Sequence, residues 1–234
     1  EVIAAESADL IGLQEALAFQ VDEILGALPS YASVGVGRDD GRRVGEFAAI
    51  LFKRDRFSVA DAGTFWLSDT PEVVASKSWG NTITRICTWA RLVDRDGRAL
   101  WLYNVHLDHQ SQPSRERSTE LLLRRIDARA RPAEPVLVTG DFNAGESNPA
   151  VTHLTKGHGV TPPRFVDTFR VLHPVATDVG TFTGFTFGLL SGEKIDYVLV
   201  EPGVDILDAR IVRSQRSGRY PSDHFPVVAT VRLK

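Results

Sequence analysis

The chain of 234 residues is 43% hydrophobic and 24% charged, the composition of an ordinary folded globular protein. Its 27 lysines and arginines against 30 aspartates and glutamates give a net charge of −3 without a polybasic block, which disfavours a protein built mainly to hold long nucleic acids. The single cysteine, Cys87, excludes an internal disulfide, and no apolar run approaches the roughly 18 residues of a membrane span. We therefore expect one monomeric domain over residues 1–234, without a membrane span.

The first residues of the chain resemble the end of a helix that runs into a strand, and the sequence contains no methionine. We expect from this that a leading segment is absent, and any targeting signal with it. The sequence accordingly assigns no cellular compartment.

Strands outnumber helices in the pattern of apolar residues, which favours two packed sheets covered on the outside by helices. The predicted helices cover residues 2–5, 16–28, 113–130 and 148–154. The predicted strands cover residues 9–15, 46–53, 57–66, 82–93, 99–106, 135–139, 194–200, 204–212 and 225–231. We expect the strands at 46–53 and 57–66 to form a hairpin-like pair.

The most informative stretch is residues 135–144, where a continuous apolar run stops at a glycine and two polar residues follow it. Continuous Val and Leu predict a strand buried on both faces. Gly140 allows a sharp turn, so that Asp141 and Asn143 lie at the end of the strand while Phe142 points the other way. A simple turn is the alternative, because Asp and Asn are common turn residues.

Similar polar residues lie at the boundaries of other predicted strands. Glu15 ends the strand at 9–15, although an acidic residue is also favourable in the first turn of the helix that follows. His106 ends an apolar strand, where a histidine is more often a structural residue. A buried Asp196 within its strand requires a polar partner. The full set of polar residues at strand boundaries is Glu15, Glu46, His106, Asp141, Asn143, Asp196, Asp223 and His224.

Strand ends on one edge of stacked sheets converge, so these residues predict a single site. A cluster rich in carboxylates suits a hard cation, and we expect Mg²⁺ or Mn²⁺. The absence of Cys and His at zinc-ligand spacing argues against structural zinc. The aromatic stretch Thr181–Gly188 is either a wall of this site or a bulged core strand.

Five short motifs occur in one order along the chain. They are Leu13-Gln14-Glu15, Asn104-Val105-His106-Leu107, Gly140-Asp141-Phe142-Asn143, Ile195-Asp196-Tyr197 and Ser222-Asp223-His224-Phe225-Pro226-Val227. In combination they resemble the endonuclease/exonuclease/phosphatase superfamily. Three further stretches, residues 37–46, 63–68 and 85–90, resemble a bacterial branch of it. The resemblance implies a mixed α/β (α+β) fold, a four-layer α/β/β/α sandwich of two packed mixed, mainly antiparallel sheets. The superfamily carries an early Asn on a first strand, which we expect to be missing before Glu1.

The resemblance also implies roles for the clustered residues. Glu15 would be the principal metal ligand, with Asp223 in the shell of the metal directly or through water. Asp141 would orient or deprotonate the attacking water, and Asn143 would hold that water and a phosphate oxygen. His224 would contact the scissile phosphate.

Supporting roles follow from the same likeness. Asp196 would fix the ring of His224. His106 would be a second histidine that faces the phosphate, supported by Glu46. Arg85 and His109 would be further contacts to the substrate phosphate.

These roles favour a Mg²⁺- or Mn²⁺-dependent phosphoesterase that hydrolyses a small phosphate ester through an activated water. A nuclease acting on DNA or RNA is the main alternative, although the net charge does not favour it. A catalytically silent phosphate-binding module is a third possibility. Such a module would be expected to have lost one of Asp141, Asp196 or His224, and all three are present.

Overall fold

The computed structural model describes residues 1–157, 163–186 and 188–233. Its largest sheet has six strands in the order β4-β5-β6-β7-β9-β8, of which β6 and β7 run parallel while the other neighbours are antiparallel. These strands are β4 (Phe57–Trp66), β5 (Ile86–Asp94), β6 (Ala99–His106), β7 (Val136–Asp141), β8 (Val166–Asp167) and β9 (Asp196–Val200). β6 and β7 are buried almost throughout, as the continuous apolar run in β7 predicts.

Two smaller antiparallel sheets pack against one face of the six-stranded sheet. One has the order β1-β3-β2, and the other pairs β10 with β11. Their strands are β1 (Leu10–Gly12), β2 (Tyr31–Val34), β3 (Ile50–Lys53), β10 (Asp205–Ile211) and β11 (Val227–Arg232). Apolar side chains from both small sheets enter one core with those of the large sheet, so the three sheets form two packed sheet layers.

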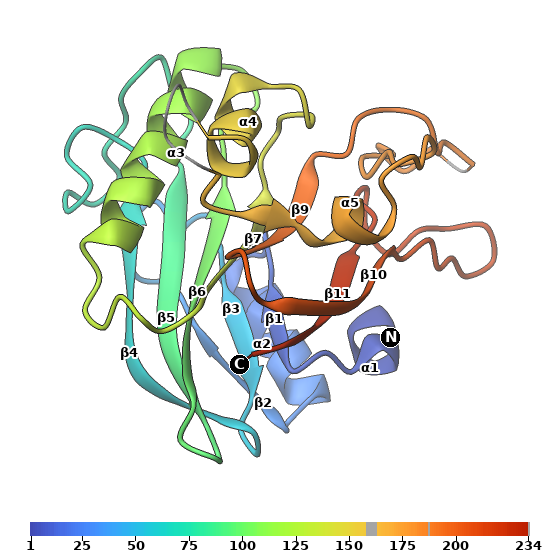
Figure 1. Ribbon diagram of the computed structural model, residues 1–234, viewed down its shortest axis with the longest axis horizontal. Coiled ribbons are helices and arrows are strands. Elements are labelled where there is room, and N and C mark those ends of the chain that lie inside the picture. Colours follow the sequence, from blue (N-terminus) through green and yellow to red (C-terminus); the bar gives the residue numbers. More distant parts are fainter. Residues whose placement is uncertain (158–162, 187, 234) are drawn as a thin grey trace.

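Alternating side chains of β6 enter the two cores on either side of the large sheet. Trp101, Tyr103 and Val105 pack under helices α3 (Gln112–Asp127) and α4 (Pro149–Thr155), whereas Leu100 and Leu102 pack against β3. Figure 1 shows α3 and α4 on the face of the large sheet that the small sheets leave uncovered. Both faces of the six-stranded sheet are therefore buried.

Helix α2 (Ala18–Ala27) supplies the fourth layer. Its Val21 packs with Tyr31 and Leu51 on the outer face of the three-stranded sheet. Two single-turn helices, α1 (Val2–Glu6) and α5 (Thr168–Leu172), complete the helices of the described residues. The predicted mixed α/β fold with four layers is confirmed. No helix in the part of the chain that is described combines the length and apolar character needed to cross a membrane.

The predicted hairpin between residues 46–53 and 57–66 is wrong. β3 pairs with β1 and β2, whereas β4 pairs with β5 in the other sheet. β3 is almost entirely buried and needs a neighbour at each edge, while the first half of β4 is largely exposed as an edge strand. The short turn between them therefore crosses from one sheet layer to the other. In the sequence, such a turn cannot be distinguished from the turn of a hairpin. β2 and α5 were not predicted, because each is too short to show a periodic pattern.

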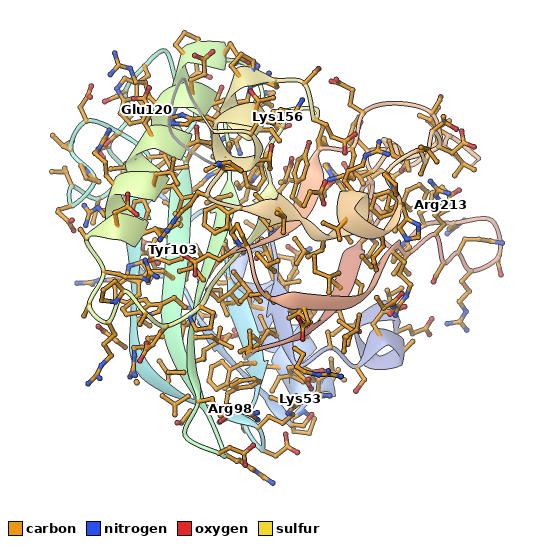
Figure 2. The ribbon with its side chains drawn as sticks, in the orientation of Figure 1. Lys53, Arg98, Tyr103, Glu120, Lys156 and Arg213 are labelled. Carbon is orange, nitrogen blue, oxygen red and sulfur yellow. The ribbon has the colours of Figure 1, made fainter. Side chains whose placement is uncertain are left out.

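The hairpin of β5 and β6 fixes which end of the large sheet carries the motifs. Val93 pairs with Ala99 beside the turn, and Cys87 pairs with Val105 at the other end. Figure 2 shows Arg98 at the turn and Tyr103 further along β6 within the body of the sheet. The residues at the other end of β6, where His106 lies, are therefore at the end of the strands opposite that turn.

Candidate active site

Strand register brings three polar side chains together at one end of the six-stranded sheet. His106 at the end of β6 pairs with Asp141 at the end of β7, and Asp141 pairs with Asp196 at the start of β9. Because β6 and β7 are parallel, their carboxyl ends meet, and the antiparallel β9 brings its first residue to the same edge. His224 joins this group from the segment before β11, and its Nδ1 bonds to Asp196.

The turn after β7 serves both the fold and the site. A Cβ at Gly140 would lie 2.2 Å from the carbonyl oxygen of Val105, so only glycine allows β6 to approach this closely. Phe142 is fully buried in the core, as predicted. The backbone N–H of Asn143 donates to Oδ1 of Asp141 at 2.7 Å, and its side-chain amide donates to Oδ2 at 3.2 Å and to Leu107 O at 3.1 Å. The predicted turn is therefore present, and it holds the side chains of Asp141 and Asn143 together at the end of β7.

His224 has the carboxylate partner that a charged histidine needs. Its Nδ1 donates to Oδ2 of Asp196 at 2.8 Å, which leaves Nε2 facing Asp141 at 3.9 Å from Oδ2. Burial alone disfavours the charged ring, but the hydrogen bond to Asp196 and the charges of Asp196, Asp141 and Asp223 raise the pKa of His224 to about 9. The ring is therefore an imidazolium at neutral pH, and Asp196 has the buried partner that the sequence required.

Asp141 lies between the two histidines. Its Oδ2 is 3.5 Å from Nε2 of His106 and 3.9 Å from Nε2 of His224. Burial, followed by the nearby charge of Asp196, raises the pKa of this carboxyl to about 7, although His224 and the N–H of Asn143 oppose the shift. A carboxyl that titrates near neutral pH is suited to exchange protons with water.

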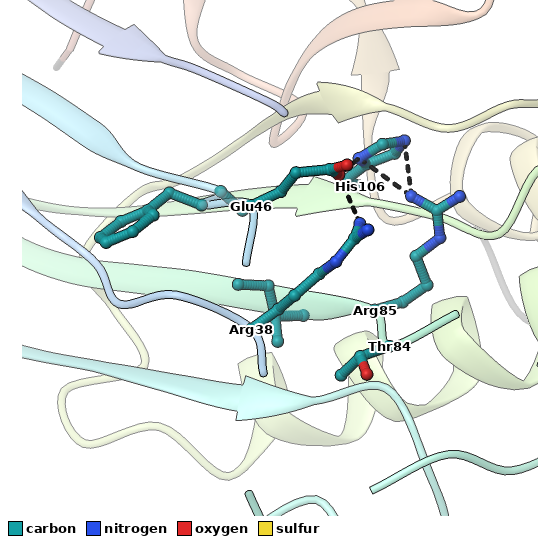
Figure 3. Close-up of a pocket in the computed structure, with 8 residues that line it drawn as sticks. Arg38, Glu46, Thr84, Arg85 and His106 are labelled. Atoms are coloured by element: carbon teal, nitrogen blue, oxygen red, sulfur yellow. Dashed lines mark hydrogen bonds and ion pairs between the residues drawn. The ribbon is translucent and has the colours of Figure 1, made fainter. Parts of the chain in front are cut away.

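His106 lies among guanidinium and carboxylate groups, and its shortest contacts are with Arg85 (Figure 3). Carboxylate oxygens of Asp141 and Glu15 lie 3.5 and 3.7 Å from its Nε2. Arg85 Nη1 lies 2.8 Å from Nε2 and 3.1 Å from Nδ1 of His106 and donates to the ring nitrogen that carries no proton, and Arg85 Nη2 is 2.8 Å from Nδ1 of His109. Burial, and then the charges of Arg85 and Arg38, lower the pKa of His106 well below its usual value. His106 is therefore neutral at neutral pH. Asp108, 3.5 Å from Arg85 Nε, balances part of the positive charge.

Glu46, expected to support His106, has Arg38 as its ion-pair partner (Figure 3). Its Oε2 is 4.0 Å from Nδ1 of His106, beyond hydrogen-bond length. Burial raises the pKa of Glu46, with the nearby charge of Glu15 adding to the shift and Arg38 opposing it. Arg38 was missed because its loop shows no strand or helix pattern. Its place in the site depends on a partner eight residues further along the chain.

A buried asparagine fixes the loop that carries Glu15. Asn104 donates to the carbonyl oxygens of Leu13 at 2.8 Å and Ala49 at 3.0 Å, and its Oδ1 accepts from Gln14 Nε2 at 2.7 Å and Thr139 Oγ1 at 3.0 Å. Glu15 itself has a left-handed backbone (φ 62°), and its side chain is 55% exposed. The motifs contained Asn104 and Gln14, but no local pattern indicates that their side chains bond across the two sheet layers.

Two groups of possible metal ligands occur among the described residues. One consists of Glu15, Glu46 and His106, and the other of Asp141, Asp196 and His224, with ligand atoms within 4.8 Å of one another in each. Asp223 belongs to neither group. Its backbone oxygen accepts from the N–H of Thr183 at 2.6 Å and from the hydroxyl at 2.9 Å, and its carboxylate raises the pKa of His224. The structure thus places Glu15 beside Glu46 and Asp223 on the side of His224.

The fold as a whole is shared with solved structures. The endonuclease/exonuclease/phosphatase from Bacteroides vulgatus has a TM-score of 0.89 and 30% identity over 100% of this chain and 88% of that chain. The mannosyl-6-phosphatase of Bacteroides thetaiotaomicron VPI-5482 has a TM-score of 0.88 and 29% identity over 99% and 88%. The catalytic domain of human nocturnin, solved with a bound sulfate, has a TM-score of 0.74 and 18% identity over 99% and 83%, which shows a likeness of fold alone.

A comparison with curated protein sequences gave no match. The family model described as Endonuclease/Exonuclease/phosphatase family matches residues 1–224, a span that includes every candidate site residue from Glu15 to His224. This match confirms the resemblance carried by the five motifs. The chain therefore belongs to the endonuclease/exonuclease/phosphatase family.

Proposed function

We propose that this chain is a divalent-metal-dependent phosphoesterase that hydrolyses phosphate esters of small molecules. The observation that carries the proposal is the position of Asp141 between a charged histidine and a neutral one. A water held there would lie next to a proton acceptor and to a fixed positive charge. Hydrolysis of a phosphate ester requires both, because the water must lose a proton as the phosphate oxygens gain negative charge.

Each residue of this group would have one task. Asp141 would accept the proton of the attacking water, for which a pKa of about 7 is well placed. Asn143, whose amide donates to Asp141 and Leu107, would accept a hydrogen bond from the water with its side-chain oxygen. To hold a phosphate oxygen as well, as the resemblance implies, its amide would have to release one of those two bonds. The His224 imidazolium would stabilise the charge that develops on the phosphate as the bond between phosphorus and the ester oxygen breaks. The water oxygen would form the new bond to phosphorus, and the ester oxygen would leave as the alcohol after taking a proton from solvent water, while the proton on Asp141 returns to solvent. The other product would be inorganic phosphate.

The other flank would hold the metal and the rest of the phosphate. Glu15 remains a predicted metal ligand on this flank, and Glu46 is a further candidate because its carboxylate lies close to that of Glu15. Asp223, the second predicted ligand, lies on the side of His224 and would approach the metal from there, directly or through water. Two neighbouring carboxylates fit a hard divalent cation such as Mg²⁺ or Mn²⁺, which prefers oxygen ligands. When bound, such a cation would neutralise phosphate oxygens and lower the pKa of a coordinated water. Arg85 and His109 would contact the phosphate from the side of His106.

Two observations support a small substrate. The chain carries a net charge of −3, whereas a protein that grips many phosphates of a long nucleic acid is usually basic. A similar protein with 29% identity over nearly the whole chain is described as a mannosyl-6-phosphatase. A phosphomonoester of a small alcohol is therefore our preferred substrate class.

The test is a substrate panel of phosphomonoesters, phosphodiesters and single- and double-stranded nucleic acids, each with Mg²⁺, Mn²⁺ or EDTA. We expect release of inorganic phosphate from monoesters that depends on the metal and is abolished by EDTA. Activity that survives EDTA would contradict metal dependence. Efficient cleavage of DNA or RNA, with no turnover of monoesters, would support the nuclease alternative instead.

A further inference from the structure

An aromatic side chain beside His224 is exposed to solvent. Phe182 is 49% exposed, and its ring centroid is 5.1 Å from that of His224, with the two planes at 61°. An exposed apolar ring in this position is available to contact a group bound at His224. Nothing in the proposed hydrolysis itself uses this phenylalanine.

Hydrogen bonds to the site hold Phe182 in this exposed position. Thr181 on one side accepts with its hydroxyl oxygen from the backbone N–H groups of Ile195 at 2.9 Å and Asp196 at 3.2 Å. Thr183 on the other side donates twice to the backbone oxygen of Asp223, at 2.6 Å from its N–H and 2.9 Å from its hydroxyl. Both threonines are buried, so the side chain between them is directed away from the core.

The same segment carries a second exposed phenylalanine at a position of backbone strain. Phe185 is 65% exposed and has φ 63°, a left-handed conformation that is a genuine outlier for a bulky residue. Its N–H donates to the hydroxyl of Thr183 at 3.2 Å, which ties this conformation to the anchored segment. Strained residues persist where the surrounding structure fixes them, and they concentrate at ligand sites. Of the stretch Thr181–Gly188, Phe187 lies outside the described residues.

We propose that Phe182, assisted by Phe185, is the surface on which the alcohol part of the phosphate ester binds. The inference rests on the proposed function, because a phosphate held at His224 would place the group attached to it over whatever borders that ring. The border includes the exposed aromatic ring of Phe182. The face of such a ring makes more contact with the carbon-bound hydrogens of a saturated ring than with a short flexible chain, which also loses more conformational entropy on binding. The substrates would therefore be phosphates of cyclic alcohols of the sugar type.

The experiment compares kcat/KM for glucose 6-phosphate and mannose 6-phosphate with kcat/KM for glycerol 3-phosphate, which has no ring. We expect the wild-type chain to prefer the cyclic esters. Phe182→Leu keeps an apolar contact with His224 but removes the flat face. It should reduce the preference about tenfold, mainly through KM, because a lost stacking contact weakens binding of the ring alone. Phe182→Trp should retain the preference, and Phe185→Ala should reduce it by a smaller factor.

The ratio of the two substrates separates binding from damage to the site. If Phe182 only supports His224, Phe182→Leu will lower kcat/KM equally for cyclic and acyclic esters, and the inference is then wrong. Leu207→Ala, which removes a side chain of the same exposure on β10, serves as the control and should leave the ratio unchanged. If no ester is hydrolysed by any variant or by the wild type, the proposed function itself fails. If the enzyme is active and Phe182→Leu leaves the preference for cyclic esters unchanged, the proposed role of Phe182 is wrong while the proposed function stands.

Discussion

The two histidines on either side of Asp141 have the same side chain but different charges at neutral pH. His224 has the Asp196 carboxylate behind it, which outweighs burial and raises its pKa to about 9. His106 is buried with Arg85 at its ring nitrogens, and its pKa lies well below the usual value. The group behind each ring therefore decides whether it is an imidazolium or a neutral imidazole.

This difference divides the site into two flanks that supply positive charge in different ways. On the flank of His224 the ring itself is the cation, and its charge depends on Asp196. On the flank of His106 the cation is Arg85, which keeps its charge at any physiological pH. Substitutions on the two flanks should therefore differ in size and in their dependence on pH.

The largest effect is expected for Asp141, which both flanks share. Asp141→Asn preserves the shape of the side chain but removes the proton acceptor, so kcat should fall by about 10²- to 10⁴-fold. The measurement is the initial rate of phosphate release at saturating substrate. A variant with near-wild-type turnover would contradict the role of Asp141 as base.

Stability gives this prediction its control. The folded-state pKa of Asp141, about 7, exceeds its ordinary value of 3.8, so ionisation of this carboxyl costs stability increasingly between pH 4 and 7 and fully above pH 7. Asp141→Asn removes that cost. At pH 8 the unfolding temperature of the metal-free variant should equal or exceed that of the wild type, and a large drop would attribute lost activity to misfolding.

The next effect tests the flank of His224. Asp196→Asn removes the charge that keeps this ring protonated, so the pKa of His224 should fall from about 9 toward its ordinary value of 6.5. The alkaline limb of kcat/KM should then move to lower pH, with a loss of about tenfold or more at pH 8 and less at pH 6. A profile that keeps its alkaline limb near pH 9 would show that Asp196 does not set the charge of His224.

The sequence predicted most of this flank because its residues lie at the ends of strands with clear apolar patterns. Register alone places Asp141 beside Asp196, and alternation directs Phe142 into the core. A buried aspartate such as Asp196 could be assigned a partner in advance, since an unpaired buried charge is costly. The boundaries of β4 and β6 could likewise be read directly from the apolar run that each contains.

The flank of His106 was harder to predict because its pairings cross between layers. Glu46 was expected to support His106, but its carboxylate forms an ion pair with Arg38 and lies 4.0 Å from the His106 ring. Arg38 lies in a loop without any periodic pattern. The same limit explains the wrong hairpin, since a short turn between two strands does not reveal which sheet each strand enters. Side-chain competition among several charged groups depends on distances that no local pattern encodes.

A smaller effect is expected for the cation on this flank. Arg85→Gln removes the positive charge next to His106 and His109, so kcat should fall about tenfold, as for the loss of one charged phosphate contact. The pKa of His106, measured by NMR titration, should rise because Arg85 no longer opposes protonation. Arg91→Gln, on the strand β5 that Arg85 directly precedes but paired with Glu134, should leave both quantities unchanged and is the matched control. An unchanged pKa of His106 would refute the electrostatic account of this flank.

The smallest effect should come from Glu46, which the family resemblance made the counterpart of Asp196. The carboxylate of Asp196 is 2.8 Å from Nδ1 of His224, whereas that of Glu46 is 4.0 Å from Nδ1 of His106 and pairs with Arg38. Glu46→Gln should therefore lower kcat only about two- to fivefold, against the tenfold or larger loss for Asp196→Asn at pH 8. It should not move the alkaline limb of the pH profile, because His106 is already neutral.

A loss as large as that of Asp196→Asn, with a shifted profile, would mean that both histidines are cations paired with a carboxylate and that the two flanks are equivalent. A raised metal requirement without a shifted profile would instead identify Glu46 as a metal ligand beside Glu15, since their carboxylates lie close together.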